Sequence, residues 1–177
     1  MLTKINDNHY QLYLLRHGKA SSENNCSDFD RSLTDTGLDQ AEKIGQWMST
    51  HDLKPDSVLT SPAKRALMTT EIVSRRLTID PKNIHIAPQM YQANLDTLLK
   101  VLAGCSPLNH KVLLVGHNPS LEYLVDYLVS ASITHELAND DRLFPATLVC
   151  VEMNVDWSQF KPYCAQLLSI THGKFLP

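Results

Sequence analysis

The stretch Tyr10-Gln11-Leu12-Tyr13-Leu14-Leu15-Arg16-His17-Gly18 determines how the rest of this chain is interpreted. Its apolar, aromatic-rich run is typical of a buried β-strand, and the polar residues that follow are typical of a loop. Ligands of open α/β sheets bind at the carboxyl ends of strands, so Arg16 and His17 stand where such folds place their chemistry. Gly18 allows a sharp turn and is expected to leave room for a ligand. Taken alone, Arg16-His17-Gly18 could equally be the end of a strand with an incidental basic pair.

Length and composition limit the classes of protein to consider. The 177 residues suit one domain with a substantial core, and we expect a single domain over residues 1–177. Sixteen basic and nineteen acidic side chains give a formal charge of −3, which argues against a nucleic-acid partner. The chain has no apolar run of membrane-spanning length and its first eight residues lack the apolar core of a signal peptide. We therefore expect no membrane association and a cytoplasmic location.

The four cysteines are widely spaced and form no C-x-x-C pair; they are Cys26, Cys105, Cys150 and Cys164. Such spacing is typical of free thiols in a reducing compartment. A zinc site would require the fold to gather them, and we expect no metal.

Two later strands are also followed by polar residues and a helix. Ser57–Thr60 is predicted as a short strand, and a helix is expected from Ala63 to Leu77, with Ser61 as its cap. Arg65 then lies in the first turn of that helix, where a cation opposes the helix dipole unless an anion is bound beside it. A solvated surface arginine is the alternative.

The clearest buried strand is Lys111–Val115, which ends in Gly116-His117-Asn118-Pro119. A helix is expected from Ser120 to Val129, with Asn118 as its cap. The first predicted strand has the same arrangement, because it too is an apolar run that ends in histidine and glycine before a helix begins.

The remaining elements complete an alternating pattern. The spacing predicts a helix over 38–48 capped by Thr34 or Thr36, an edge strand over 83–87, a helix over 94–102, strands over 146–153 and 163–171, and loops over 21–31 and 130–142. Strands that alternate with helices, without repeats or linkers, predict a three-layer α/β/α sandwich around a mostly parallel central sheet.

The ends of three predicted strands carry Arg16 with His17, Arg65, and His117. If these strands are parallel neighbours, the four side chains converge. Guanidinium groups match phosphate oxygens bidentately, and a neutral imidazole is an accepted covalent nucleophile. The same cations would stabilise the charge of a phosphoryl transition state. The pattern therefore predicts a phosphoryl-transfer pocket.

Three segments resemble the signatures of the histidine phosphatase (phosphoglycerate mutase-like) superfamily; they are Leu15-Arg16-His17-Gly18, Ser61-Pro62 with Arg65-Ala66, and Gly116-His117-Asn118-Pro119. The stretch from Asp28 to Gly37 resembles the D-x-D-R-x-L-T-x-x-G segment of its small SixA-type branch of phosphohistidine phosphatases. Phe144-Pro145-Ala146-Thr147 resembles the step before a strand in that branch. The resemblance runs from about residue 10 to residue 171.

This resemblance implies a role for each matching position. His17 would be the nucleophile that forms a phosphohistidine intermediate, with its other ring nitrogen held by the Gly18 carbonyl. Arg16, Arg65 and His117 would bind the phosphoryl oxygens, and neither a metal nor a cofactor would be needed. Further candidates for contact with the phosphate are Gly18, Ser22 and Asn118.

The chain departs from the larger members of the superfamily, which carry a carboxylate proton donor after the third strand. Here Pro88–Asn94 contains no acid. General acid catalysis is worth about 10²–10⁴-fold for a poor leaving group, whereas an imidazole or aryl oxide needs less help. The departure favours phosphohistidine or an activated ester as substrate. Glu23, Asp28 and Asp30 are candidate substitutes, although solvated loop acids are the simpler interpretation.

The sequence thus predicts a metal-independent SixA-type phosphatase that acts on a phosphorylated protein, such as a histidine phosphotransfer domain, in signal transduction. The alternative within enzymes is a small-molecule phosphomonoesterase. The alternative from another class is a phosphate- or phosphoprotein-binding module without turnover, against which the retained His17 argues. Short loops leave no cap domain, so an open, shallow site is expected.

Overall fold

A six-stranded mixed sheet forms the centre of the computed structural model, which describes residues 9–22, 26–130 and 143–177. The strand order is β3-β2-β4-β1-β5-β6. The first four of these strands pair in parallel, and β5 pairs antiparallel with both β1 and β6. The strands are β1 (Tyr10–Arg16), β2 (Ser57–Thr60), β3 (Ile84–Ile86), β4 (Lys111–Gly116), β5 (Thr147–Met153) and β6 (Ala165–His172).

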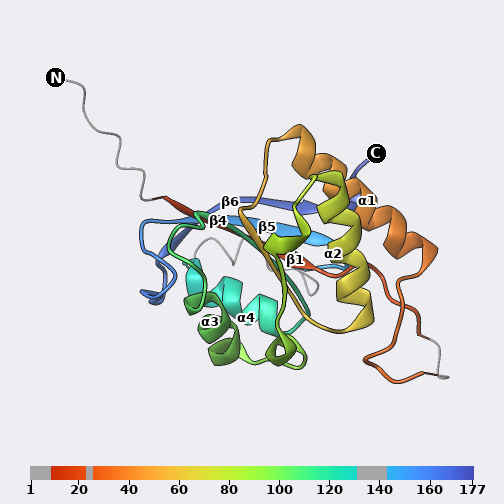
Figure 1. The fold of residues 1–177 in the computed structure, drawn as a ribbon, viewed down its shortest axis with the longest axis horizontal. Coiled ribbons are helices and arrows are strands. Elements are labelled where there is room, and N and C mark those ends of the chain that lie inside the picture. Colours follow the sequence, from red (N-terminus) through yellow and green to blue (C-terminus); the bar gives the residue numbers. More distant parts are fainter. Residues whose placement is uncertain (1–8, 23–25, 131–142) are drawn as a thin grey trace.

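Helices cover both faces of the sheet (Figure 1). One face is covered by α1 (Asp35–Thr50) and α2 (Lys64–Arg76), and the other by α3 (Leu95–Ala103) and α4 (Ser120–Leu128). Three short 3₁₀ turns complete the described elements, namely η1 (Pro81–Asn83), η2 (Pro88–Met90) and η4 (Gly173–Phe175). The predicted three-layer α/β/α sandwich is confirmed, as is the position of β3 at the edge of the sheet.

The side chains of β1 alternate between two hydrophobic clusters. Leu12 and Leu14 pack into the cluster beneath α3 and α4, whereas Tyr13 and Leu15 pack into the cluster beneath α1 and α2. All four are fully buried. Successive side chains of a strand point to opposite faces, and a strand covered on both faces therefore has a continuous apolar sequence. This explains why the run before Arg16 shows no alternation of apolar and polar residues.

The parallel register brings the ends of β1, β4 and β2 together. Arg16 of β1 pairs with Gly116 of β4, and Thr60 of β2 pairs with Val115 of β4. The residues that follow these strands therefore meet at one edge of the sheet, where open α/β sheets bind their ligands.

Position 18 has no room for a side chain, because the backbone of Gly37 packs against it. A Cβ atom on Gly18 would lie 2.5 Å from the carbonyl oxygen of Gly37, and a Cβ atom on Gly37 would lie 2.1 Å from the carbonyl oxygen of Lys19. The two glycines let the loop after β1 pack on the first turn of α1, which Thr34 caps as predicted. The expectation that Gly18 leaves room for a ligand is wrong, because the backbone of Gly37 fills that space.

Two predicted helix caps are wrong. The N-cap of α2 is Ala63 rather than Ser61, and the N-cap of α4 is Pro119 rather than Asn118. The Ser61 hydroxyl bonds instead to a histidine, and the Asn118 amide bonds to Glu122 and to the backbone of residue 143. In both cases at least one partner more than twenty residues away in the sequence, His117 for Ser61 and Leu143 for Asn118, binds the side chain that could have capped the helix.

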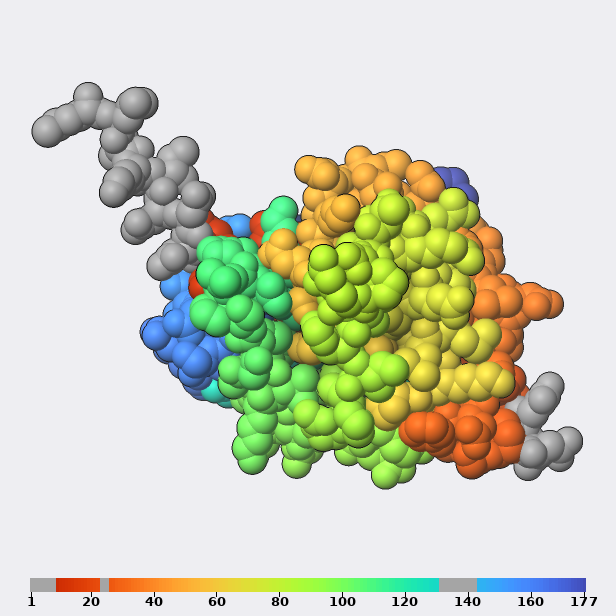
Figure 2. All heavy atoms as spheres, in the orientation of Figure 1, coloured from red at the N-terminus to blue at the C-terminus, as the bar shows by residue number. Residues whose placement is uncertain are grey.

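The loop after β1 folds back onto α2. The backbone amide of Lys64 donates to the carbonyl oxygen of Phe29 at 3.0 Å. In the space-filling view the orange-red segment that follows β1 lies against the yellow beginning of α2 (Figure 2). This contact brings Asp28 beside the site described below. Of the predicted loop over 130–142, residues 131–142 lie outside the described part.

In the described ranges, no helix combines the length and the apolar character needed to cross a membrane. The four cysteines have free thiols. Within the same ranges, no cluster of three or more histidine, cysteine or acidic side chains is arranged to hold a metal ion.

Candidate active site

His17 follows β1 directly, and its side chain is almost fully buried. Its Nδ1 atom lies 2.7 Å from the carbonyl oxygen of Gly18. A carbonyl oxygen can only accept, so Nδ1 carries the proton and Nε2 keeps its lone pair. The Nε atom of Arg65 donates to that Nε2 atom at 3.1 Å. The ring is therefore fixed in the tautomer that a nitrogen nucleophile requires.

Burial lowers the pKa of His17 to about 3. The hydrogen bond to Gly18 acts in the opposite direction, but His117, Arg65 and Arg16 reinforce the lowering. The imidazole is therefore neutral throughout the physiological range of pH, as a nucleophile must be.

Arg65 occupies the first turn of α2 and is buried, so it is not the solvated surface arginine of the alternative interpretation. Besides its bond to His17, its Nη2 atom donates to Oδ2 of Asp28 at 3.0 Å, and its Nη1 atom donates to the Asp28 backbone carbonyl. A buried cation at a helix N-terminus is suited to an anion, which interacts favourably with both the charge and the dipole.

Arg16 is the last residue of β1, at the same edge of the sheet as His17. Its Nη1 atom donates to the carbonyl oxygen of Leu143, and its own carbonyl accepts from the amide of Ala146. The charge of Arg16 contributes to the lowered pKa of both His17 and His117. Arg16 is therefore electrostatically part of the same pocket.

His117 follows β4, and its ring centroid lies 5.1 Å from that of His17. Burial, followed by the charge of Arg65, lowers the pKa of His117 to about 4, so this ring is also neutral. Its Nε2 atom lies 2.7 Å from the hydroxyl oxygen of Ser61, which accepts from the amide of Ala63 at 3.4 Å.

The Ser61 hydroxyl hydrogen can therefore be donated to Nε2 of His117, which leaves the ring proton on Nδ1. That Nδ1 atom is buried and has no hydrogen-bond partner within the described part of the chain. Buried polar groups are nearly always hydrogen-bonded, and a phosphoryl oxygen would satisfy this donor.

The structure thus brings together the four side chains that the three motifs supply. The phosphate contacts predicted for Gly18, Ser22 and Asn118 stay predictions, and Asn118 lines the cavity described below together with Arg65 and His117. The Gly18 amide donates to Thr69, and the Asn118 amide nitrogen donates to Glu122 and to the Leu143 carbonyl. Ser22 is exposed and makes no hydrogen bond to the four side chains in the described ranges.

The three loop acids have different positions. Asp28 accepts from Arg65, Arg31 and Tyr91. Partial desolvation opposes its charge, but the hydrogen bonds from Arg31 and Arg65 outweigh this effect and hold the pKa of Asp28 below its usual range. An ionised carboxylate cannot donate a proton at neutral pH. Asp30 instead accepts from the Ser27 hydroxyl at the surface, and Glu23 lies outside the described residues.

A cavity of about 530 Å³ lies beside two of the four side chains, Arg65 and His117. Its lining includes Arg65, Tyr91, Asn94, His117, Pro119 and Tyr123, but not His17. Its rim at Asn94, Pro119 and Tyr123 is exposed, so the cavity opens to solvent. Its volume is within the range of small-molecule pockets. The cavity is therefore larger than the shallow site that the short loops predicted.

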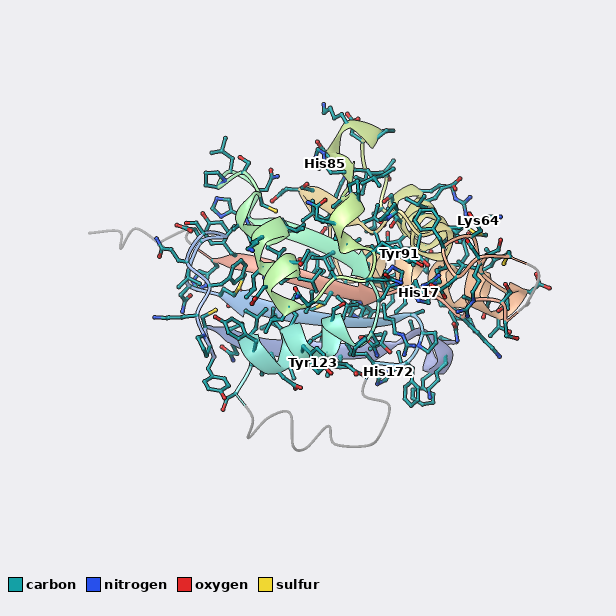
Figure 3. The ribbon with its side chains drawn as sticks, turned by 90° about the horizontal axis from the view of Figure 1, so that it is seen from below. His17, Lys64, His85, Tyr91, Tyr123 and His172 are labelled. Atoms are coloured by element: carbon teal, nitrogen blue, oxygen red, sulfur yellow. The ribbon has the colours of Figure 1, made fainter. Side chains whose placement is uncertain are left out.

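Sequence reasoning missed two residues of this region. Ser61 was assigned to a helix cap, and its contact with His117 depends on the pairing of β2 with β4. Tyr91 was not singled out, although it lies in the segment after β3 where larger members of the superfamily carry their acid. Its ring centroid lies 6.3 Å from that of His117, and Figure 3 shows it toward the same end of the sheet as His17.

Comparison with known proteins agrees with this geometry. A family model described as "Histidine phosphatase superfamily (branch 1)" matches residues 12–96. The chain is 29% identical over 119 residues to phosphohistidine phosphatase SixA of Escherichia coli (strain K12), which covers 65% of this chain and 71% of that protein.

Solved structures extend the similarity to nearly the whole chain. A protein from Agrobacterium tumefaciens, described as a candidate phosphohistidine phosphatase SixA, superposes with a TM-score of 0.78 at 28% identity, covering 92% of this chain and 97% of that one. Protein histidine phosphatase SixA complexed with tungstate shares the fold, with a TM-score of 0.76 at 22% identity and coverage of 93% and 97%. Residues 12–96 of this chain therefore match the histidine phosphatase superfamily, and SixA phosphohistidine phosphatases are among the chain's homologues in sequence and structure, which supports a phosphatase enzyme.

Proposed function

We propose that this phosphatase hydrolyses phosphohistidine on a protein, through a phosphorylated His17. The observation that supports the proposal most directly is the state of that side chain. His17 is buried and neutral, its Nδ1 proton is held by the Gly18 carbonyl, and its Nε2 lone pair faces the Arg65 guanidinium. A non-catalytic anion-binding module would need the arginines but would not need a neutral imidazole with an oriented lone pair.

In the first step, Nε2 of His17 attacks phosphorus. The N–P bond forms as the bond to the leaving group breaks, and the electron pair of that bond stays on the leaving atom. Arg16, Arg65 and the Nδ1 proton of His117 would bind the non-bridging oxygens, where charge is concentrated in the transition state. The Gly18 carbonyl stabilises the positive charge that the imidazole acquires on phosphorylation.

In the second step, water attacks the phosphohistidine and the N–P electron pair returns to Nε2. Inorganic phosphate then leaves, and His17 regains the neutral tautomer that the Gly18 contact selects. The proposal requires neither a metal ion nor a cofactor, because the arginines supply positive charge and His17 supplies the nucleophile.

Phosphohistidine is favoured as substrate because, within the described residues, neither the segment after β3 nor Asp28 offers a carboxylic acid to the leaving group. The segment after β3 contains none, and Asp28 is held ionised by Arg31 and Arg65. An imidazole leaves phosphorus more easily than an alkoxide. The proteins named as phosphohistidine phosphatases that resemble this chain at 28–29% identity agree with this choice. The partner would be a histidine phosphotransfer domain or another protein that carries phosphohistidine.

One observation favours a second function, that of a small-molecule phosphomonoesterase. The cavity of about 530 Å³ beside Arg65 and His117 has the size of a small-molecule site. A metabolite with an alkyl phosphate would then be turned over rapidly.

The two functions can be separated by one panel of substrates. The protein and its His17→Ala and His85→Ala variants would be given a phosphohistidine-bearing phosphotransfer domain, an aryl phosphate and an alkyl phosphate. His85 is an exposed histidine of β3 and serves as the matched control. Turnover of phosphohistidine and the aryl ester that is lost only in His17→Ala supports the proposal. Fast alkyl turnover would favour the metabolite phosphatase, and phosphate binding without any turnover would favour the binding module.

A further inference from the structure

Two donors meet on one oxygen atom of Asp28. Oδ2 accepts from Nη2 of Arg65 at 3.0 Å and from the hydroxyl of Tyr91 at 3.1 Å. A carboxylate oxygen carries partial negative charge, as does an oxygen that departs from phosphorus. The Asp28 oxygen therefore marks a point where Arg65 and Tyr91 together bind a negatively charged oxygen.

Tyr91 is held in place by aromatic contacts on two sides. The ring of Phe29 packs edge-on against it at 5.0 Å between centroids. The ring of His117 lies 6.3 Å away, nearly perpendicular to it. In the view of Figure 3, Tyr91 and His17 both lie toward the carboxyl ends of the strands, and the ring of His117 contacts both. The hydroxyl is therefore directed to the site by packing and does not depend on its bond to Asp28 alone.

The cavity lies on the side of the site from which a leaving group would depart. Arg65, His117 and Tyr91 line it, whereas the nucleophile His17 does not. In an in-line displacement the attacking and leaving atoms lie on opposite sides of phosphorus. With Nε2 of His17 on one side, the leaving atom would point into the cavity where the Tyr91 hydroxyl lies.

We propose that Tyr91 is a catalytic residue that donates its phenolic proton to the leaving atom, in place of the carboxylic acid that is absent after β3. This inference rests on the proposed function, because it requires attack by His17. It widens the substrate class from phosphohistidine to phosphate esters whose leaving groups need a proton, aryl esters above all.

The proton transfers balance over the two steps. Nε2 of His17 forms the bond to phosphorus while the bond to the leaving oxygen breaks, and that oxygen takes the electron pair of the bond and the proton of Tyr91. The phenolate of Tyr91 then accepts a proton from the water that attacks the phosphohistidine. The N–P electron pair returns to Nε2, and the products are phosphate, an alcohol or phenol, and the original enzyme.

Tyr91 suits this role better than Asp28 does. Partial desolvation and the Asp28 carboxylate raise the pKa of Tyr91, so its hydroxyl remains protonated at neutral pH. Asp28, by contrast, is ionised. The Asp28 side chain is 51% exposed, so it can turn into solvent when a substrate oxygen takes its place between Arg65 and Tyr91.

The test is the dependence of rate on the leaving group. Tyr91→Phe keeps the ring and its contact with Phe29, and Tyr163→Phe removes a hydroxyl from an exposed tyrosine outside the cavity. Both variants and the unsubstituted protein would be assayed on aryl phosphates that range from dinitrophenyl to unsubstituted phenyl phosphate. Inhibition by inorganic phosphate would show that the anion pocket is intact in each variant.

We expect the loss in Tyr91→Phe to grow with the basicity of the leaving group. It should be less than about threefold for dinitrophenyl phosphate and about 10²-fold for phenyl phosphate, at the lower end of general acid effects. Tyr163→Phe should have the same rate as the unsubstituted protein on every ester. The same loss on all esters, or no loss, would overturn the inference while leaving His17 as the nucleophile. Absence of turnover in the unsubstituted protein would instead overturn the proposed function itself.

Discussion

The Nε atom of Arg65 donates a hydrogen bond to Nε2 of His17, at 3.1 Å. The lone pair that accepts this bond is the one that must attack phosphorus. Arg65 must therefore release Nε2 as the phosphoryl group arrives, and its guanidinium is then in position to bind the phosphoryl oxygens. The hydrogen bond keeps the Nε2 lone pair of His17 oriented in the free enzyme, and it places a cation beside the phosphorus atom that reacts.

Replacement of Arg65 by lysine should reduce kcat by about 10²–10³-fold, the usual cost of a lost donor to transition-state charge. Lysine keeps the charge but cannot reach His17 and the phosphoryl oxygens with a planar fork of donors. Arg75→Lys, at an exposed position of the same helix, is the control and should leave kcat unchanged. Steady-state kinetics on an aryl phosphate would measure both, and equal activity of the two variants would contradict this role for Arg65.

Asp28→Asn should tighten the binding of inorganic phosphate. In the structure the Asp28 carboxylate competes for the guanidinium of Arg65, and asparagine removes the charge while keeping the shape. An ion pair with one exposed partner is worth about 1 kcal/mol or less, so the inhibition constant should fall by up to about fivefold. A higher inhibition constant would show that Asp28 positions Arg65 for the anion rather than competing with it.

Ser61→Ala should allow the ring proton of His117 to move between Nδ1 and Nε2. Without the hydroxyl at 2.7 Å, Nε2 of His117 loses its partner, at a cost of about 1–3 kcal/mol in the free energy of unfolding. The ring proton is then no longer held on Nδ1, which the ¹⁵N chemical shifts of His117 would report. Ser74→Ala is the matched control, because Ser74 is also buried and its hydroxyl has no partner among the described residues. Unchanged His117 shifts in Ser61→Ala would contradict the assignment.

The two neutral histidines make stability depend on pH. The pKa values of His17 and His117 are lowered from 6.5 to about 3 and about 4. Below pH 6.5 the unfolded chain binds protons that the native site excludes, so the free energy of unfolding should fall as the pH drops from 6.5 toward 4. Urea denaturation at several pH values would measure this slope.

The contribution of the two site histidines to that slope can be isolated. The slope should be shallower in a His17→Gln, His117→Gln double variant than in His85→Gln, whose histidine lies on the exposed edge strand β3. Equal slopes in the two variants would contradict the neutral state assigned to the site.

Much of the fold and of the site could be predicted because both depend on buried parallel strands. The runs before Arg16 and His117 are apolar throughout because helices cover both faces of the sheet. Their strands are neighbours, so residues that follow them meet at one edge. Family motifs identified the same positions together with Arg65.

The remaining features depend on contacts between segments distant in sequence. Ser61 and Asn118 have the residue types of helix caps, but His117 and the Leu143 carbonyl form hydrogen bonds with them instead. The role of Gly18 depends on how closely the first turn of α1 approaches it. Tyr91 has no motif of its own, and its hydroxyl forms a hydrogen bond with Asp28, which lies in a loop more than sixty residues earlier.

The central claim is that His17 carries the phosphoryl group, and trapping of the intermediate tests it most directly. The protein would be mixed with a ³²P-labelled phosphohistidine substrate, quenched within milliseconds in alkali, where phosphohistidine survives, and digested for peptide mapping. We predict label on the peptide that contains His17, and none in His17→Ala, whose phosphate pocket retains Arg16 and Arg65. Turnover at the normal rate in His17→Ala, or label on any other residue, would contradict the account.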